Sequence, residues 1–380
     1  MVLKILHVIP YFAAAYGGPV QAVRDIARMQ LDCGIDAEIA TTTANGATEL
    51  TTEQFAGERV VIHCFERTFP RGWFHSRALG VWLTRHACDY HALHLHVPFT
   101  HPFLCAARAA QRAGIPYAVS PHGMLDPWSL RHKAWKKAPY LALIEGANLA
   151  RAHLIHVTSV MEADGLRAHG YAERVRVVPL GVALPSDITR LASAQLRLLY
   201  LSRLHPVKGL PTLLHAVAQV SGLDVRLTIA GEGDPRYAES LRTMVSKLGL
   251  TNKVDFVGHL DDDAKCAAWR AHDVFVLPSL HENFSLSTVE AMASGMPAIV
   301  SDQIGVAGWI SATGAGAVVP CRDPQALALA IAGMRDDASR LRMGAQARRL
   351  VEQEYATRVV GKRYAELAQE LIGSKRNGAR

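Results

Sequence analysis

Two glutamates eight residues apart lie in the part of the sequence with the clearest potential for chemistry. Glu282 and Glu290 follow a short apolar run at 274–277. We expect a helix to begin near Ser285 or Ser287, which leaves Glu282 in the loop before the helix and Glu290 about one turn inside it. The unpaired N–H groups at a helix start are positively polarised and favour an anion.

This arrangement suits a ligand with a diphosphate and two sugars. A diphosphate held by the N–H groups of Leu286 and Ser287 would place one sugar near Glu282 and a ribose near Glu290. A carboxylate matches a ribose diol because it accepts two hydrogen bonds. The alternative is structural, since acidic residues near a helix start also stabilise the helix dipole.

Two cations follow the first expected strand of the second half of the chain. Arg203 and Lys208 come directly after the apolar run 196–201. Fixed cations at this position suit a diphosphate and stabilise a leaving group that gains negative charge. An exposed basic loop is the alternative interpretation.

A glycine pair follows the next apolar run. Gly231 and Gly233 come after 225–230 and permit a close approach of the backbone. The pattern is not G-x-G-x-x-G, because no third glycine stands near Tyr237. A nicotinamide dinucleotide site is therefore disfavoured.

Along the whole chain, short apolar runs alternate with amphipathic stretches. This rhythm is typical of a doubly wound α/β fold with parallel sheets. Amphipathic stretches occur at 20–32, 74–87, 102–113 and 140–151. The runs expected to form strands are 3–9, 37–42, 60–65, 92–97, 117–120, 154–158 and 175–179, then 196–201, 225–230, 254–257, 274–277, 298–301 and 316–319.

The two series of strands predict two Rossmann-like domains that face each other across a cleft. We expect an N-terminal domain at 1–185, a linker within 181–195, a C-terminal domain at 196–355, and a helix at 356–380 that crosses back to the first domain and ends in a disordered tail from 373. Ligands of such sheets bind beyond the carboxyl ends of the strands, which directs attention to the cleft.

Several motifs taken in order resemble the retaining glycosyltransferases of family 4, which have the GT-B fold. The similarity extends over nearly the whole chain and is densest from 196 to 319. It is carried by the motifs at 202–209, 230–233 and 256–258, by the pair Glu282 and Glu290, and by the segment 291–297 that follows.

The resemblance implies a role for each matching position in the second half. Arg203 and Lys208 would bind the diphosphate of a nucleotide-sugar donor, Glu290 its ribose, and Glu282 the donor sugar. Other donor-binding positions that the resemblance implies are Gly231, Gly233, His259, Leu260, Asn283, Phe284, Ser285 and Leu286.

In the first half, two further positions match the family. Gly17 and Gly18 follow the first expected strand, where family members place a glycine-rich loop near the phosphate and the acceptor. A helix-entry turn explains these glycines equally well. One histidine among 18 is more often structural, but the place of His122 after the strand at 117–120 favours a functional role. It resembles the histidine that contacts the donor sugar in the family.

An acidic run at 261–263 raises the question of a metal. We interpret these aspartates as the cap of a helix at 264–272, since Asp is favoured at helix starts. The resemblance likewise points away from a required metal, and no cofactor is expected beyond the donor as substrate.

The charge balance restricts the partners. The chain has 380 residues and a net charge of +7, yet it shows no zinc-finger or RNA-recognition signature, so nucleic acid is disfavoured. The most basic segment contains Arg131, Lys133, Trp135, Lys136 and Lys137. It suits an anionic membrane surface or an acceptor, or is simply a solvated helix face.

Two features of the sequence, its cysteine pattern and its N-terminal run, bear on the cellular compartment of the protein. Six dispersed cysteines without a C-x-x-C pattern fit a reducing environment. The N-terminal run breaks at Pro10, as in a first strand and unlike a secretion signal. We expect a cytoplasmic protein, peripheral on the inner face of the plasma membrane if it binds a membrane.

The resulting hypothesis is a retaining, metal-independent sugar transfer from a GDP- or UDP-sugar, with mannose as the sugar, to a hydroxyl of a glycan or lipid-linked glycan in polysaccharide biosynthesis. Two alternatives remain. One is a nucleotide-sugar epimerase of the same fold, and the other is a non-catalytic protein that binds a nucleotide sugar or a glycan. A two-carboxylate hydrolase is disfavoured because donor binding explains both glutamates.

Overall fold

The computed structural model describes residues 2–13, 16–46, 48–50, 55, 57–131, 134–186, 195–220 and 222–377. The chain divides into two compact units. Unit 1 comprises Met1–Gly181 and Thr357–Arg380, and unit 2 comprises Val182–Ala356. Most of the expected linker, 187–194, lies outside the described residues.

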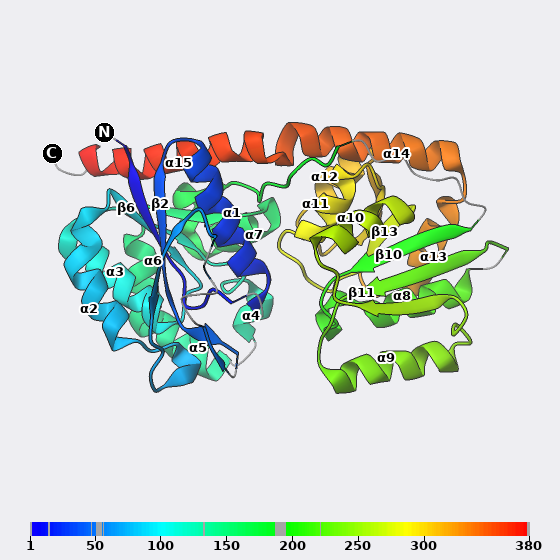
Figure 1. Ribbon diagram of the computed structural model, residues 1–380, viewed down its shortest axis with the longest axis horizontal. Coiled ribbons are helices and arrows are strands. Elements are labelled where there is room, and N and C mark those ends of the chain that lie inside the picture. The colour runs from blue at the N-terminus through cyan, green and yellow to red at the C-terminus, as the bar shows by residue number, and fades with distance from the viewer. Residues whose placement is uncertain are drawn as a thin grey trace. The chain divides into compact units, whose positions relative to one another are not determined.

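Unit 1 is built on a seven-stranded parallel sheet in the order β5-β2-β1-β6-β7-β8-β9 (Figure 1). Its strands are β1 (Lys4–Val8), β2 (Asp36–Thr42), β5 (Val61–Phe65), β6 (Ala92–His96), β7 (Tyr117–Ser120), β8 (Leu154–Val157) and β9 (Val175–Val177). A small antiparallel pair, β3 (Ala44–Asn45) and β4 (Thr48–Glu49), follows β2.

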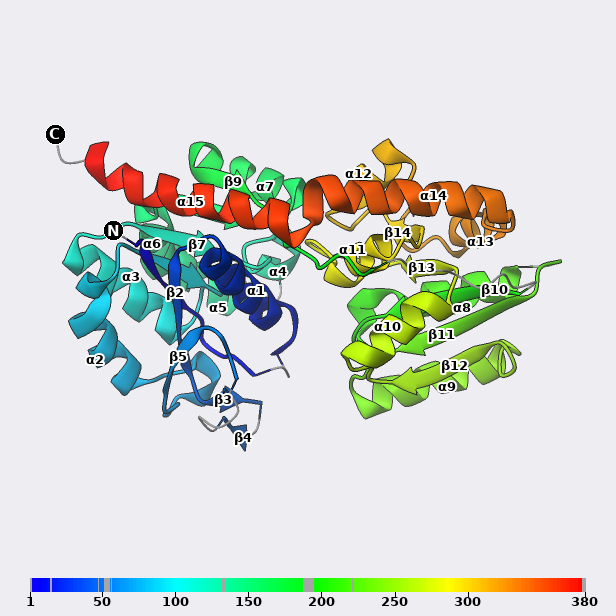
Figure 2. The same cartoon turned by 45° about the horizontal axis from the view of Figure 1, so that its top comes forward.

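Helices cover both faces of this sheet. They are α1 (Gly18–Asp32), α2 (Arg77–His86), α3 (His101–Ala113), α4 (Pro127–Arg131), α5 (Ala134–Tyr140), α6 (Gly146–Arg151), α7 (Val160–Leu166) and α15 (Thr357–Asn377). The helices α1 and α15 lie side by side although they come from opposite ends of the sequence (Figures 1 and 2). Residues of α2, α3, α6 and α7 pack on the other face.

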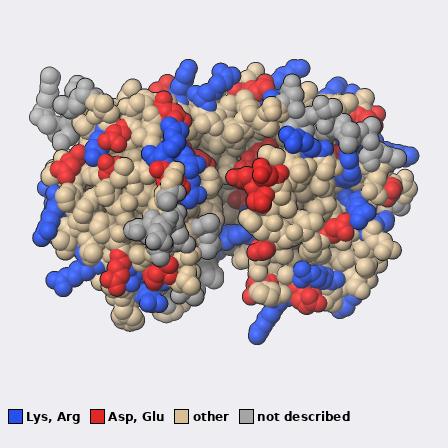
Figure 3. Space-filling model, viewed as in Figure 1, with Lys and Arg blue, Asp and Glu red and all other residues tan. Residues whose placement is uncertain are grey.

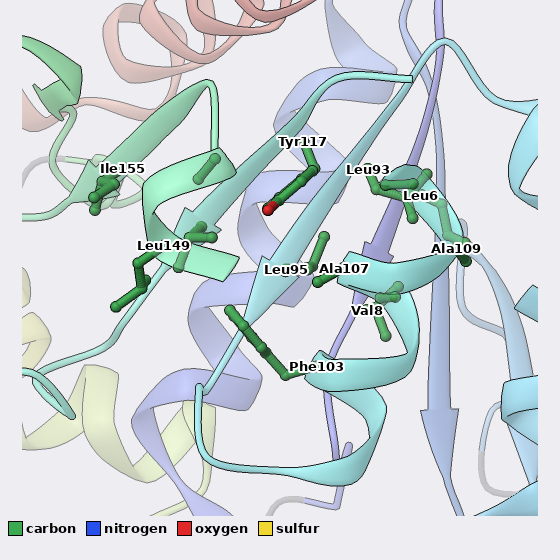
Figure 4. Packing of buried hydrophobic residues seen from close by; sticks show 14 of the residues in the cluster. Leu6, Val8, Leu93, Leu95, Phe103, Ala107, Ala109, Tyr117, Leu149 and Ile155 are labelled. Atoms are coloured by element: carbon green, nitrogen blue, oxygen red, sulfur yellow. The ribbon is translucent and has the colours of Figure 1, made fainter. Parts of the chain in front are cut away.

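The two-residue period of the strands sorts the side chains between these faces. In β1, Leu6 and Val8 join the cluster that Phe103 of α3 completes (Figure 4), whereas Ile5 packs with Ala368 of α15. Leu93, Leu95, Tyr117 and Ile155 of the neighbouring strands share the first cluster (Figure 4). The alternate positions of the same strands therefore face α1 and α15.

Unit 2 contains a six-stranded parallel sheet in the order β12-β11-β10-β13-β14-β15. Its strands are β10 (Leu196–Leu201), β11 (Val225–Ala230), β12 (Val254–Gly258), β13 (Val274–Leu277), β14 (Ala298–Ser301) and β15 (Gly316–Val319). Its helices are α8 (Leu210–Gln219), α9 (Pro235–Lys247), α10 (Asp262–Ala271), α11 (Leu286–Ala293), α12 (Ala307–Thr313), α13 (Pro324–Gly333) and α14 (Asp337–Leu350).

The expected α/β class with two doubly wound parallel sheets is confirmed, and the expected strands are all present within one or two residues of their ends. Two expectations were wrong in part. The stretch 140–151 is not one regular α-helix but a π-helical turn at Leu141–Glu145 followed by α6. The tail from 373 continues α15 as far as Asn377.

Candidate functional site

At the carboxyl edge of the unit 2 sheet, the loops after neighbouring strands are hydrogen-bonded to one another. The Ser202 N–H donates to the Ala230 carbonyl oxygen at 3.1 Å, and the Leu204 N–H donates to the Glu232 carbonyl at 2.8 Å. The Gly231 N–H in turn donates to the Gly258 carbonyl at 2.6 Å. The loops after β10, β11 and β12 thus form one connected rim.

The two glycines after β11 are required by this contact between loops. A Cβ atom on Gly231 would overlap the Ser202 carbonyl, and one on Gly233 would overlap the Leu204 carbonyl. Gly231 also has a φ of 130°, which side chains disfavour. The close backbone approach expected at these positions is therefore made to the protein's own neighbouring loop.

The rim continues across β13 and β14. The Leu280 N–H donates to the Val207 carbonyl at 2.7 Å, which joins the loop after β13 to the loop after β10. The Glu282 N–H donates to the Gln303 carbonyl at 2.9 Å, and the Glu282 carbonyl accepts from the Gly305 N–H at 2.8 Å. Both backbone polar groups of Glu282 are thereby fixed.

Lys208 and Glu282, which are 74 residues apart in the sequence, form an ion pair on this rim. Their side chains are only 12% and 22% exposed. His205 lies between Arg203 and Lys208 in the sequence, and its pKa is lowered first by burial and then by the charges of these two residues. The structure thus brings Lys208 and Glu282 together.

The second glutamate lies inside α11, as expected. The helix begins at Leu286, and Ser285 before it adopts a left-handed conformation with a φ of 71°. The Oγ atom of Ser285 lies 2.6 Å from Oγ1 of Thr288. Leu286 and Ser287, the first two residues of the helix, are half-buried.

Two positions before α11 differ in what they can offer a ligand. The side chain of Phe284 is buried and packs edge-on against Tyr355, with ring centroids 5.7 Å apart. Its contribution to binding is therefore restricted to its backbone. Asn283 is half-buried.

Glu290 faces a cation on the neighbouring helix. Burial opposes ionisation of Lys265, but the charges of Glu290 and Asp262 prevail and raise its pKa. The Nζ atom of Lys265 lies 2.8 Å from the Asp262 carboxylate. The sequence offered no sign that a lysine of α10 would face Glu290.

Asp261 caps α10, as predicted, because its carboxylate accepts a hydrogen bond from the Ala264 N–H at 2.8 Å. Acidic side chains gather where this helix lies (Figures 1 and 3). At the end of β12, His259 is exposed and Leu260 half-buried, and Gly258 before them has a φ of 74°.

In unit 1, His122 follows β7 in a left-handed conformation with a φ of 48°. The next residue is fixed by a buried carboxylate, since the Gly123 N–H donates to Oε1 of Glu162 at 2.8 Å. Burial raises the pKa of Glu162 to about 7. Gly17, with a φ of 70°, is the N-cap residue of α1, and Gly18 begins that helix.

A row of buried histidines behind His122 was not anticipated from the sequence. His7 of β1, His94 and His96 of β6, and His156 of β8 all lie on the face opposite to Phe103. The signal was present, since histidine recurs at alternate positions in buried strands. Within the described residues, nitrogen atoms of His7, His94 and His96 lie within 4.8 Å of one another, a spacing that a metal ion also permits.

The basic segment over α4 and α5 is only partly described. Lys133 lies outside the described residues, and the side chain of Lys136 is not described either. Arg131 is exposed and Trp135 is 75% exposed. The Nζ atom of Lys137 instead donates to the Ser129 carbonyl at 2.8 Å, which ties this lysine to the protein. No described helix has the length and apolar character needed to cross a bilayer.

Comparison with known families finds a glycosyltransferase domain in each of the two units. Residues 17–181 match the glycosyl transferase 4-like domain, and residues 186–350 match the family described as glycosyl transferases group 1. The chain belongs to the group 1 glycosyltransferases. It has the GT-B fold of that family.

Curated relatives match over parts of their length. The D-inositol 3-phosphate glycosyltransferase of Streptomyces avermitilis is 31% identical over 271 residues, covering 64% of this chain and 58% of the relative. The phosphatidyl-myo-inositol mannosyltransferase of Mycobacterium leprae is 38% identical over 141 residues, or 36% of each chain. The chain thus spans little more than half of these relatives at most.

Solved structures share the fold over nearly the full chain. Anabaena HepE in complex with UDP and glucose has a TM-score of 0.78 at 21% identity, covering 97% of this chain and 100% of that one. Sucrose-phosphate synthase from Thermosynechococcus elongatus has a TM-score of 0.73, also at 21% identity, covering 98% of this chain and 100% of that one.

Proposed function

We propose that this group 1 glycosyltransferase moves a sugar from a nucleotide diphosphate donor to a hydroxyl group with retention of anomeric configuration. The main observation in support of the proposal is the hydrogen-bonded rim of unit 2. It pairs Lys208 with Glu282 and fixes the backbone of Glu282 just before the start of α11, at the carboxyl edge of one sheet. That edge is where α/β sheets bind ligands.

The rim offers a separate group for each part of such a donor. The N–H groups at the start of α11, with Arg203 and Lys208, bind the diphosphate. Glu290 accepts hydrogen bonds from the ribose, and Glu282 from the donor sugar. When the diphosphate pairs with Lys208, the carboxylate of Glu282 is released from its ion pair with that lysine. It can then accept hydrogen bonds from the sugar.

The reaction we propose needs no nucleophile from the protein. The acceptor hydroxyl oxygen forms a bond to the anomeric carbon on the face from which the phosphate oxygen departs. The hydroxyl proton passes to that phosphate oxygen, and a nucleoside diphosphate leaves. Lys208 and Arg203 stabilise the charge that develops on the phosphate, so the protein acts by positioning and electrostatics.

We propose mannose as the donor sugar and a glycan or a lipid-linked glycan as the acceptor. One curated relative is named a mannosyltransferase that acts on phosphatidyl-myo-inositol, whereas similar solved structures contain UDP or UDP-glucose. Both GDP- and UDP-sugars are therefore candidates. The exposed Arg131 and Trp135 suit contact with an anionic membrane at the inner face of the plasma membrane.

A donor screen tests this proposal. We expect one of GDP-mannose, UDP-glucose or an ADP-sugar to raise the melting temperature, because a ligand that binds the folded state stabilises it. With that donor and a lipid-linked glycan acceptor, we expect a product in which the anomeric configuration of the donor is kept.

Three other results would contradict the proposal. A product of inverted configuration would exclude retention. Isomerised donor in the absence of acceptor would establish an epimerase. Binding of donor without transfer to any glycan or lipid-linked glycan, in a protein that stays folded, would leave only a binding function.

A further inference from the structure

Behind His122, two histidines and a glutamine form a buried chain of hydrogen bonds. Nε2 of His122 lies 3.0 Å from Nδ1 of His96, and Nε2 of His96 lies 3.0 Å from Nδ1 of His7. Nε2 of His7 lies 2.7 Å from Oε1 of Gln30 on α1. His7, His96 and Gln30 are at most 2% exposed, so water does not compete for these bonds.

The rings of this chain point at one another. The centroids of His7 and His96 are 5.3 Å apart with nearly parallel planes, and those of His96 and His122 are 5.2 Å apart. Each distance between ring centroids exceeds the corresponding nitrogen–nitrogen distance by about two ring radii. The two nitrogens therefore lie close to the line that joins the centroids, and the lone pair of one nitrogen faces the N–H of the next. This is the geometry of in-line hydrogen bonds.

All three imidazoles are neutral near pH 7. Burial lowers the pKa of His7 to about 4 and that of His122 to about 3, and it lowers the pKa of His96 well below its usual value. A neutral imidazole has one N–H and one acceptor nitrogen. Each hydrogen bond in the chain therefore determines the proton position in the next ring.

The direction of the chain is set at Gln30. Its Oε1 only accepts, so Nε2 of His7 carries the proton and Nδ1 of His7 accepts from Nε2–H of His96. Nδ1 of His96 then accepts from Nε2–H of His122. Nδ1 of His122 is left without a proton, and it has no hydrogen-bond partner among the residues that the structure describes. His122 is half-buried.

We propose that Gln30, His7 and His96 are positioning residues that hold His122 with its proton on Nε2, so that its Nδ1 accepts a hydrogen bond from a hydroxyl group of the ligand. This inference rests on the proposed function for the identity of that ligand, a sugar. It also restricts the contact, because an acceptor nitrogen pairs with a sugar hydroxyl and repels a phosphate oxygen.

A second series of hydrogen bonds on the same face of the sheet provides a matched control. Nε2 of His156 donates to the Val178 carbonyl at 2.8 Å, and its Nδ1 lies 2.7 Å from Oγ of Ser120. The Ser120 hydroxyl lies 2.7 Å from Nε2 of His94. Ser120 is as buried as Gln30 but has no bond to His122, so Ser120→Ala perturbs the same sheet face outside the proposed chain.

The test is a long-range ¹H–¹⁵N correlation spectrum of the full chain with ¹⁵N-labelled histidine, in which His122→Gln identifies the signals of His122. We expect His122 to be protonated at Nε2 alone in the parent protein and in Ser120→Ala. In Gln30→Met and His96→Phe we expect a mixture of the two neutral forms. Gln30→Met is nearly isosteric, and a melting curve checks that it folds.

Activity provides the second readout. We expect Gln30→Met to lower kcat/KM for transfer about three- to tenfold, the effect of one hydrogen bond, and to have no further effect in a His122→Ala background. Three findings would overturn the inference: a proton on Nδ1 of His122 in the parent, an unchanged His122 spectrum in both Gln30→Met and His96→Phe, or a metal ion bound by His7, His94 and His96. Failure of transfer with the expected spectra would instead refute the proposed function alone.

Discussion

At the level of single residues, the proposed donor site depends on side chains whose charges are held on one rim. Lys208 and Glu282 form an ion pair at low exposure, and the charge of Glu290 helps to raise the pKa of Lys265 against the effect of burial. The sequence indicated the types of these residues and their positions after strands. It did not indicate the Lys208–Glu282 pair, because which loops meet depends on the order of strands in the sheet.

Replacing Lys208 by methionine should lower kcat for transfer about a hundred- to a thousandfold, the usual loss when one preorganised charge-stabilising group is removed. Steady-state kinetics with the donor identified in the screen measures this. Lys247→Met, at an exposed position near the end of α9, is the matched control and should leave kcat unchanged. Equal kinetics for the two variants would contradict a role of Lys208 in the reaction.

Replacing Glu290 by alanine should weaken binding of the nucleoside diphosphate about ten- to a hundredfold, because hydrogen bonds from the ribose to a charged group are lost. Binding of inorganic pyrophosphate should change much less, since it has no ribose. Titration calorimetry with both ligands gives the comparison. A similar loss for both would mean that Glu290 does not contact the ribose.

At the scale of elements, the sequence was informative wherever a local pattern decides the structure. Short apolar runs predicted the strands, and the start of α11 and the cap of α10 followed from Ser285 and Asp261. The row of buried histidines could not be predicted in this way, because it forms only when β1, β6, β7 and β8 become neighbours in that order. A local sequence pattern does not determine the order of strands in a sheet.

The contact between the loops after β10 and β11 leads to a stability prediction. Gly231→Ala should reduce the free energy of unfolding by on the order of 3 kcal/mol, because it adds a backbone overlap to an unfavourable φ. Gly249→Ala, at a φ of 68° with open space around it, should cost only about 1 kcal/mol. Urea unfolding of both variants measures the difference, and equal losses would show that the loops do not require this close approach.

At the scale of the whole molecule, buried titratable groups make stability depend on pH. The folded-state pKa values of His7 and His156 are lowered to about 4 by burial. Their contribution is present above the unfolded value of about 6.5 and is lost as the pH falls through about 4. Glu162 acts in the opposite sense, because its raised pKa gives a contribution that is present below its ordinary value and lost as the pH rises through about 7.

We therefore expect the free energy of unfolding to fall as the pH is lowered from 6.5 to 4, by up to about 3 kcal/mol for each of these two histidines, partly offset by Glu162. Urea unfolding at a series of pH values tests this. Replacement of the exposed His215 should leave the slope unchanged, whereas His156→Gln should reduce it. A flat profile in the parent protein would contradict neutral buried histidines.

A crystal structure with the nucleoside diphosphate of the preferred donor bound tests the proposed donor site most sharply. We expect both phosphates at the start of α11 in contact with Lys208 and Arg203, and the ribose hydroxyls on Glu290. Phosphates bound elsewhere, with Lys208 still paired to Glu282, would contradict the proposed site.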